Sequence, residues 1–428
     1  MSWRESLSEL VNFLDKYDSE RTFQFKGSLQ RKFTELEDLV MDQLIYEAVG
    51  SLIIEANRWV RHFKRLLEET KAFEEVREIL MTRELKSFLS DPKRHLKKKI
   101  MFYLHDMLRE VIDLESFEDK ALAAIKTSLR TNMRTIYQDW ILLTIVNIIL
   151  SSGGKVAYPE SKVISLERSG AQKLGWIPPN MVLRIPGKGY ISIFIEVPRP
   201  IGWGDTKDLM RIWKLYTTLR PDIMVYSGMI MNILDLSSDP PIKRPDLIIE
   251  VKELSDWYER IREVRGPFAK PLTVERWRSM WIEGLWDGLA GILGVKRKGR
   301  REEVEEERKV KRLRDVEIVK LYKAFYKPKY MMVITRRRTP SKIRRLLEED
   351  GIIVIDKIGF NRKRLFPAAE ILRRIAASEN ELQIKLSGRI YNEIRRLASE
   401  YGISEDRLVD ILLNIGLKHK GEVNDYLN

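Results

Sequence analysis

The sequence contains no cysteine among its 428 residues, which excludes disulfides, thiolate metal sites and cysteine nucleophiles together. Histidine is also scarce: four residues, at positions 62, 95, 105 and 419, are too scattered to suggest a metal site built on imidazoles. A metal ion bound to this chain would therefore have to be held by carboxylates.

Long hydrophobic runs are lacking as well. The most apolar stretch, from Trp140 to Leu150, is about half the length that a membrane-spanning helix needs, so we expect a buried helix there. The N-terminus, Met-Ser-Trp-Arg-Glu, becomes charged at once and shows no secretory signal. These features predict a soluble, cytoplasmic protein with no membrane partner.

Positive charge is abundant: 77 lysines and arginines against 63 aspartates and glutamates leave a net charge of +14. Such a surplus favours a polyanionic partner, nucleic acid first and an anionic membrane surface second. Hydrophobic residues at 44% indicate a folded chain, and its length predicts two or three domains. The wealth of isoleucine, lysine, arginine and glutamate is typical of thermophile proteins.

Hydrophobic patterning divides the chain into three regions. Residues 1–128 repeat apolar positions at three- and four-residue spacing, which predicts a helical domain that braces the rest or binds DNA or a partner. Residues 129–378 alternate strand-like and helix-like stretches, with a charged, exposed insertion expected at 296–314. Residues 380–428 form a third domain. The fold class predicted is α/β.

The central region should contain a mixed set of strands and helices. A helix is expected over 131–150, ending before Gly153 and Gly154. The expected strands are 155–157, 163–166, 181–185, 190–197, 222–226, 246–252, 330–335 and 351–357, and further helices are expected at 255–264, 273–291, 341–349 and 367–377.

The C-terminal region opens with a strict alternation that places two sets of side chains on opposite faces of a strand. The apolar set is Leu382, Ile384 and Leu386, and the polar set is Gln383, Lys385 and Ser387. Helical spacing of apolar residues follows, Gly402 closes that helix, and Ser404 is suited to cap the next. A lone strand leaves its edge hydrogen bonds unmet, so pairing with the same strand of a second subunit is expected.

In spacing and in each element, residues 382–420 resemble the ribbon-helix-helix family. The resemblance implies a homodimer formed through the strand, with Gln383, Lys385 and Ser387 entering the DNA major groove. It also implies a phosphate held at the start of the second helix, near Ser404. Glu405 and Asp406 depart from this pattern because they would repel a phosphate. A dimerisation tail without DNA contact is the alternative.

Two carboxylates mark apolar strands of the central region. Asp222 opens one strand, in Arg-Pro-Asp, and Glu250 and Lys252 end another, in Glu-Val-Lys. Adjacent strands would bring Asp222 and Glu250 within reach of one hard cation, Mg²⁺ or Mn²⁺, and Lys252, on the same side as Glu250, would orient the nucleophile or stabilise developing charge. Asp246 is a rival, but it lies roughly 13 Å from Glu250 along the strand. Glu196 is a further strand carboxylate that could join the site.

These motifs look like those of the PD-(D/E)xK nuclease superfamily, over roughly residues 130–360. The resemblance implies a mixed-sheet, restriction-endonuclease-like domain that cleaves DNA with a metal cofactor held by Asp222 and Glu250. Relatives often carry an acidic residue on the helix before the sheet, which would make Asp139 an additional catalytic carboxylate. Here Gln138 occupies the position where those relatives carry glutamate. The alternative is that these carboxylates lie at solvated strand ends or form ion pairs with a purely structural role.

Together these features predict a dimeric, metal-dependent DNA endonuclease with a ribbon-helix-helix tail. Basic clusters such as Arg336-Arg337-Arg338 would neutralise the DNA backbone beside the nuclease domain, although such runs are also common on solvated surfaces. The alternative is a catalytically inactive DNA-binding regulator or organiser of a DNA complex, in a mobile-element or defence context. A basic structural protein without sequence preference is a third possibility.

Overall fold

The structure, a computed structural model, describes residues 2–168, 176–197, 220–235, 242–264, 311–376 and 388–403, with positions 405, 408, 409, 411, 412 and 415. These residues form a mixed α/β protein. Its helices are α1 (Trp3–Tyr17), α2 (Gly27–Lys71), α3 (Arg83–Ser90), α4 (Pro92–Leu108), α5 (Leu114–Ser151), α9 (Asp315–Tyr326), α10 (Ser341–Glu349), η2 (Arg362–Leu365), α11 (Phe366–Ile375) and α12 (Gly388–Tyr401). Its strands are β1 (Glu78–Leu80), β2 (Lys155–Tyr158), β3 (Val163–Ser165), β4 (Met181–Ile185), β5 (Gly189–Ile195), β6 (Ile223–Ser227), β7 (Leu247–Lys252), β8 (Ile261–Val264), β9 (Lys311–Arg314), β10 (Tyr330–Thr335) and β11 (Ile353–Ile355).

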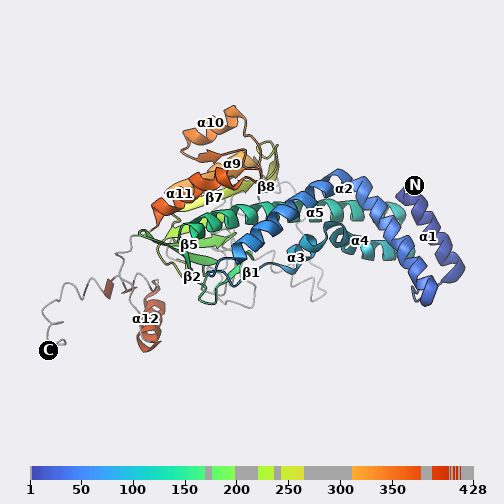
Figure 1. The fold of residues 1–428 in the computed structure, drawn as a ribbon, viewed down its shortest axis with the longest axis horizontal. Helices are drawn as coiled ribbons and strands as arrows, with labels where there is room; N and C mark the ends of the chain where they lie inside the picture. Colours follow the sequence, from blue (N-terminus) through green and yellow to red (C-terminus); the bar gives the residue numbers. More distant parts are fainter. Residues whose placement is uncertain are drawn as a thin grey trace, which may run out of the picture.

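The N-terminal helices form an elongated bundle that extends away from the sheet (Figure 1). Their starts are capped by short polar side chains, as in Asp91 before α4 and Asp113 before α5, each accepting a hydrogen bond from a backbone amide in the first turn. The long helix α2 bends at Val49, whose backbone is not helical. The region is not helical throughout, since β1 pairs in parallel with β3.

Helix α5 joins the bundle to the sheet. It begins well before the expected residue 131, so the predicted domain boundary at 128 falls inside this helix. All its residues from Ile136 to Leu150 are buried, because α2 and α11 and the sheet surround this end of the helix. One hydrophobic core contains buried residues of both regions, from Trp3 in α1 to Ile375 in α11. The helical and sheet regions are therefore held together by shared packing.

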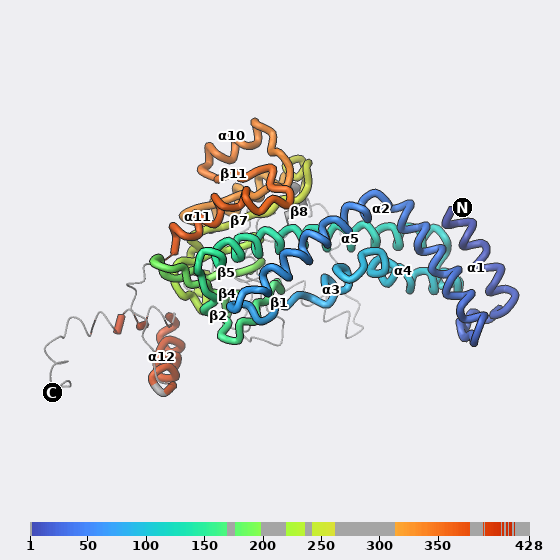
Figure 2. The backbone as a smooth tube through the Cα atoms, viewed as in Figure 1, coloured from blue at the N-terminus to red at the C-terminus, as the bar shows by residue number. Residues whose placement is uncertain are grey.

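The main sheet has seven strands in the order β11-β10-β7-β6-β5-β4-β2. Strands β7, β10 and β11 are parallel to one another, while β7, β6, β5, β4 and β2 form a run of antiparallel pairs. The carboxyl ends of β7, β10 and β11 consequently lie at the same end of the sheet, where ligands commonly bind in sheets with parallel strands. Helices α2 and α5 run side by side from the bundle to this sheet (Figure 2).

Two cores cover the two faces of this sheet. The bundle-side core joins the sheet to α2, α5 and α11, and the α9-side core joins it to α9 and α10. Along β7, Ile249 and Val251 belong to the bundle-side core and Ile248 to the α9-side core. Because side chains alternate along a strand, Glu250 and Lys252 share the face of Ile248.

Some of the expected elements are wrong. The helix expected over 255–264 is instead a series of turns that leads into β8. Strand β8 pairs antiparallel with β9, so the end of the charged stretch, Lys311–Arg314, is a strand. Helix α9, directly after it, was not expected. The rest of the charged stretch and the helix expected at 273–291 lie outside the described residues.

Among the described residues, the longest helices fall short of the apolar character needed to cross a membrane.

Helix α12 covers the first helix expected in the C-terminal region. Gly402, which follows it, has a φ of +63°, a conformation that glycine adopts without strain. Ile394 and Ala398 pack with Leu408 in a small core of their own. The expected strand with Gln383, Lys385 and Ser387, as well as Ser404, lies outside the described residues.

Candidate functional site

Strand pairing brings Asp222 and Glu250 together. Ile223 of β6 lies opposite Ile249 of β7, and continuing this register by one residue sets Asp222 opposite Glu250. The Asp222 amide donates a hydrogen bond to Glu250 Oε1 (2.9 Å), and the Val251 amide donates one to Asp222 Oδ2 (2.8 Å). Both side chains are only 3% exposed. We call these two residues the carboxylate pair.

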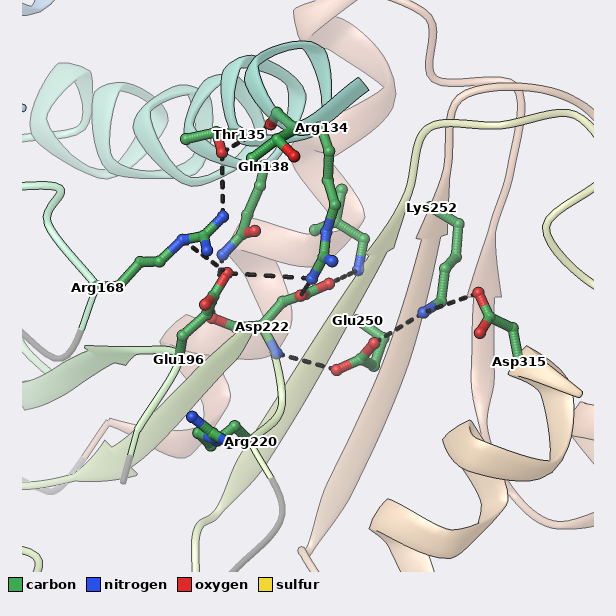
Figure 3. A network of polar contacts seen from close by, with 12 residues as sticks. Arg134, Thr135, Gln138, Arg168, Glu196, Arg220, Asp222, Glu250, Lys252 and Asp315 are labelled. Atoms are coloured by element: carbon green, nitrogen blue, oxygen red, sulfur yellow. Dashed lines mark hydrogen bonds and ion pairs between the residues drawn. The ribbon is translucent and has the colours of Figure 1, made fainter. Parts of the chain in front are cut away.

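Lys252 lies beside this pair and is itself buried. Its Nζ atom is 3.0 Å from Glu250 Oε2 and 4.0 Å from Oδ2 of Asp315, the first residue of α9. It also lies 5.9 Å from the centre of the Trp257 ring. A buried lysine is stable only where opposite charges compensate the loss of water. Glu250 and Asp315 supply that compensation and hold the amine in one place (Figure 3).

Helix α5 closes the other side of the pair. Arg134 Nη2 is 3.1 Å from Asp222 Oδ1, and Gln138, one turn further along the helix, donates from Nε2 to the Asp222 carbonyl at 3.3 Å. Glu196 completes this side: its Oε1 lies 4.0 Å from Arg134 and 3.3 Å from Arg168 Nε. Figure 3 shows both arginines reaching toward the acidic side chains from separate elements.

The two carboxylates of the pair ionise differently. Burial and the adjacent charge of Asp222 raise the pKa of Glu250 to about 7, although Lys252 opposes the shift. Burial acts to raise the pKa of Asp222 too, but Arg134, Lys252 and the Val251 amide outweigh it and hold that pKa below its ordinary value of 3.8. At neutral pH Asp222 is therefore fully ionised, whereas Glu250 is present in both its protonated and its ionised form.

This difference predicts a pH-dependent stability. Between about pH 4.5, the ordinary value, and about 7, the folded protein keeps the Glu250 proton that the unfolded chain has lost. The free energy of unfolding of the wild type should therefore fall, relative to Glu250→Gln, as the pH rises through this window. We expect a relative change on the order of 3 kcal/mol, measured by urea unfolding in EDTA at pH 5 and pH 8. An equal difference at both pH values would contradict it.

The carboxylate pair suits a hard divalent cation by the chemistry of its oxygen donors. Each of its four oxygens already accepts a hydrogen bond or ion pair, from the Val251 and Asp222 amides, from Arg134 and from Lys252. Within the described ranges, no group of three or more acidic or histidine side chains could hold a metal ion. A cation would thus rely on the pair itself and would compete with Arg134 and Lys252 for its oxygens.

The other acidic residues considered from the sequence lie differently. Asp246 is at the opposite end of β7, where its Oδ2 accepts from the Ser227 amide at 2.8 Å. Asp139 is 2% exposed, and its Oδ2 has no hydrogen-bond partner among the described residues. Burial raises the pKa of Asp139 well above its ordinary value, despite the charge of Arg168. No contact links Asp139 to the pair within the part of the chain described, so its catalytic role stays a prediction.

Four residues of the site were not anticipated: Arg134, Arg168, Asp315, and Gln138 as a direct contact. Arg134 and Gln138 are four residues apart on a helix and so share one face, a spacing that could have drawn attention to them. Asp315 carries no such signal, because it reaches Lys252 from a helix that lies more than 60 residues away in sequence.

Comparison with known proteins adds no relative: no protein-family model, no curated protein and no solved structure matches this chain.

Proposed function

We propose that this protein is a metal-dependent DNA endonuclease of the PD-(D/E)xK type, with Mg²⁺ or Mn²⁺ as its cofactor. The observation that carries the proposal is the meeting of Asp222, Glu250 and Lys252 at the ends of two adjacent strands, all three buried. The proposal includes a restriction-endonuclease-like fold for the central region. Supporting it, a long helix precedes antiparallel strands that bear the acidic residues, and a further helix leads to β10, which pairs in parallel with β7.

Each side chain of the site has a chemical task in this proposal. The bound cation would polarise the scissile phosphodiester and lower the pKa of a water molecule. Asp222, ionised at neutral pH, supplies the permanent negative charge of the pair. Lys252, held by Glu250 and Asp315, would donate a hydrogen bond to the attacking water or to the phosphate oxygen that gains charge. Gln138 fixes the main chain of Asp222.

The tail would dimerise the enzyme and place it on DNA in the manner of ribbon-helix-helix proteins. Apolar side chains remain exposed on both helical stretches of the tail: Ile390 is 51% exposed, Ile411 41%, Leu412 44% and Ile415 50%. Exposed apolar side chains at helical spacing are typical of a surface that binds a partner, because they add nothing to the stability of a monomer. Gln383, Lys385 and Ser387 would contact base edges and Ser404 a phosphate.

A second candidate function is a DNA-binding regulator that keeps the fold and lacks the chemistry. One observation favours it: the guanidinium of Arg134 and the amine of Lys252 already neutralise the carboxylate pair. A protein whose acidic pair is permanently neutralised in this way needs no cation to be stable. It would then bind or organise DNA without cutting it.

Incubation with supercoiled plasmid separates the two candidates. With Mn²⁺ or Mg²⁺ the wild type should nick or linearise the plasmid, and EDTA or Glu250→Gln should abolish the product. Glu348→Gln, an exposed carboxylate of α10, is the matched control and should cleave like the wild type. Absence of product with either metal, together with a protected DNA footprint, would reject the endonuclease and favour the regulator.

A further inference from the structure

A surface cavity of about 450 Å³ lies between α2 and the loops that follow β10 and β11. One face of α2 supplies Arg58, Trp59 and His62. The lining residues of this helix recur every three or four positions, which places them on the same face. The loops supply Arg336, Arg337 and Phe360. Its size falls within the range of pockets that hold a nucleotide-sized ligand.

The cavity has an aromatic floor and cationic walls. His62 stacks on Phe360 with ring centres 4.7 Å apart, and Trp59 contacts Phe360 edge-on at 5.4 Å. Arg336 lies over the Trp59 ring and pairs with Glu55 at 2.9 Å, so the charge of the one lining carboxylate is already matched. Arg58 and Arg337 are exposed, and neither side chain forms an ion pair with any described residue. Two guanidinium groups that have no ion-pair partner among the described residues therefore line an open cavity.

This cavity is fixed to the strand that carries the candidate site. The Arg336 amide donates to the Lys252 carbonyl at 2.9 Å, and Arg336 Nε donates to the Glu253 carbonyl at 2.7 Å. Since β7 and β10 run in parallel, the loop after β10 emerges at the end of the sheet where Lys252 lies. A polymer bound at the carboxylate pair would have to extend only a short distance to reach α2.

We propose that this α2 pocket binds a backbone phosphate of the DNA strand that enters the nuclease site, with Arg58 and Arg337 as its ligands. The inference rests on the proposed function for the identity of the polymer. Guanidinium groups match phosphate oxygens in geometry and charge. The helical region would thus be part of the DNA track and would do more than brace the sheet.

The test is binding by the full chain, measured without divalent metal so that cleavage plays no part. Fluorescence anisotropy with a labelled duplex of arbitrary sequence would compare the wild type with the Arg58→Ala, Arg337→Ala double variant across salt concentrations. Loss of this phosphate contact should weaken binding about tenfold and reduce the slope of log affinity against log salt by about one. Arg61→Ala is the matched control, since Arg61 is exposed on α2 but does not line the pocket.

Each outcome decides the inference. A wild type that binds no duplex, a double variant within twofold of the wild type with the same salt slope, or an equal loss in Arg61→Ala would overturn it. Loss of labelled mononucleotide or inorganic phosphate binding with intact duplex binding would assign the pocket to a small anion and reject the DNA track. Failure of the nuclease proposal would be seen elsewhere, as missing plasmid cleavage by a protein that still shows pocket-dependent binding.

Discussion

Lys252→Gln is expected to lower Mn²⁺-dependent DNA cleavage by about a hundred- to a thousandfold, the usual cost of losing one donor to the transition state. The amine is held 3.0 Å from Glu250, and Lys252 is 4% exposed, so solvent has little access to the position of the lost donor. DNA binding should stay within threefold of the wild type, because the buried amine adds little to the charge of the protein surface. The measurement is the single-turnover cleavage rate at saturating enzyme.

Two further variants protect this test from a folding artefact. Lys252→Arg keeps the positive charge between Glu250 and Asp315 and should fold normally while remaining well below the wild-type rate, since guanidinium and ammonium groups place their donors differently. Lys320→Gln removes a half-buried lysine of α9 that pairs with Asp350 and should leave the rate unchanged. Wild-type cleavage by a folded Lys252→Gln protein would remove Lys252 from the chemistry.

Arg134→Gln is expected to strengthen Mn²⁺ binding at least tenfold. The guanidinium lies 3.1 Å from Asp222 Oδ1, where it repels a cation and occupies an oxygen that the cation needs. At an effective permittivity of 20, removing a unit charge about 5 Å away is worth roughly 3 kcal/mol, which exceeds the 1.4 kcal/mol of a tenfold change. Isothermal titration with Mn²⁺ at pH 8 measures the affinity.

Arg168→Gln is the matched control for this variant. Among the described residues Arg168 pairs with Glu196 and does not contact Asp222, so its loss should change Mn²⁺ affinity less than threefold. Without metal, Arg134→Gln should also lower stability, because it leaves the buried Asp222 charge without its partner, at a cost of about 3 kcal/mol or more. Unchanged or weaker Mn²⁺ binding in Arg134→Gln would show that the arginine does not compete with a cation.

The strands that form the site follow from the sequence because each has a strong local signal. The apolar runs before Lys252 and after Asp222 are buried on both faces, and such runs read as central strands. Their mutual register depends on pairing between distant segments, yet two acidic residues at matching strand ends were enough to suggest it. The strand predicted over 330–335 and the helix predicted over 341–349 coincide with β10 and α10.

Other parts could not be read from local pattern. Leu254, Trp257, Tyr258 and Ile261 have the spacing of a helical stripe, but tertiary packing places Trp257 over Lys252 and Ile261 in β8. Asp315 meets Lys252 only through the packing of α9 against the sheet, which no short segment encodes. The pairing of Arg134 with Asp222 likewise depends on where a 38-residue helix crosses the strand ends.

The most direct test of the central claim is a crystal structure of the full protein grown with Mn²⁺ and measured at a wavelength where manganese scatters anomalously. We expect an anomalous peak within about 2.5 Å of oxygens from both Asp222 and Glu250, with the Arg134 guanidinium moved away from Asp222. A Mn²⁺-saturated crystal without that peak, and with Arg134 still paired to Asp222, would contradict it.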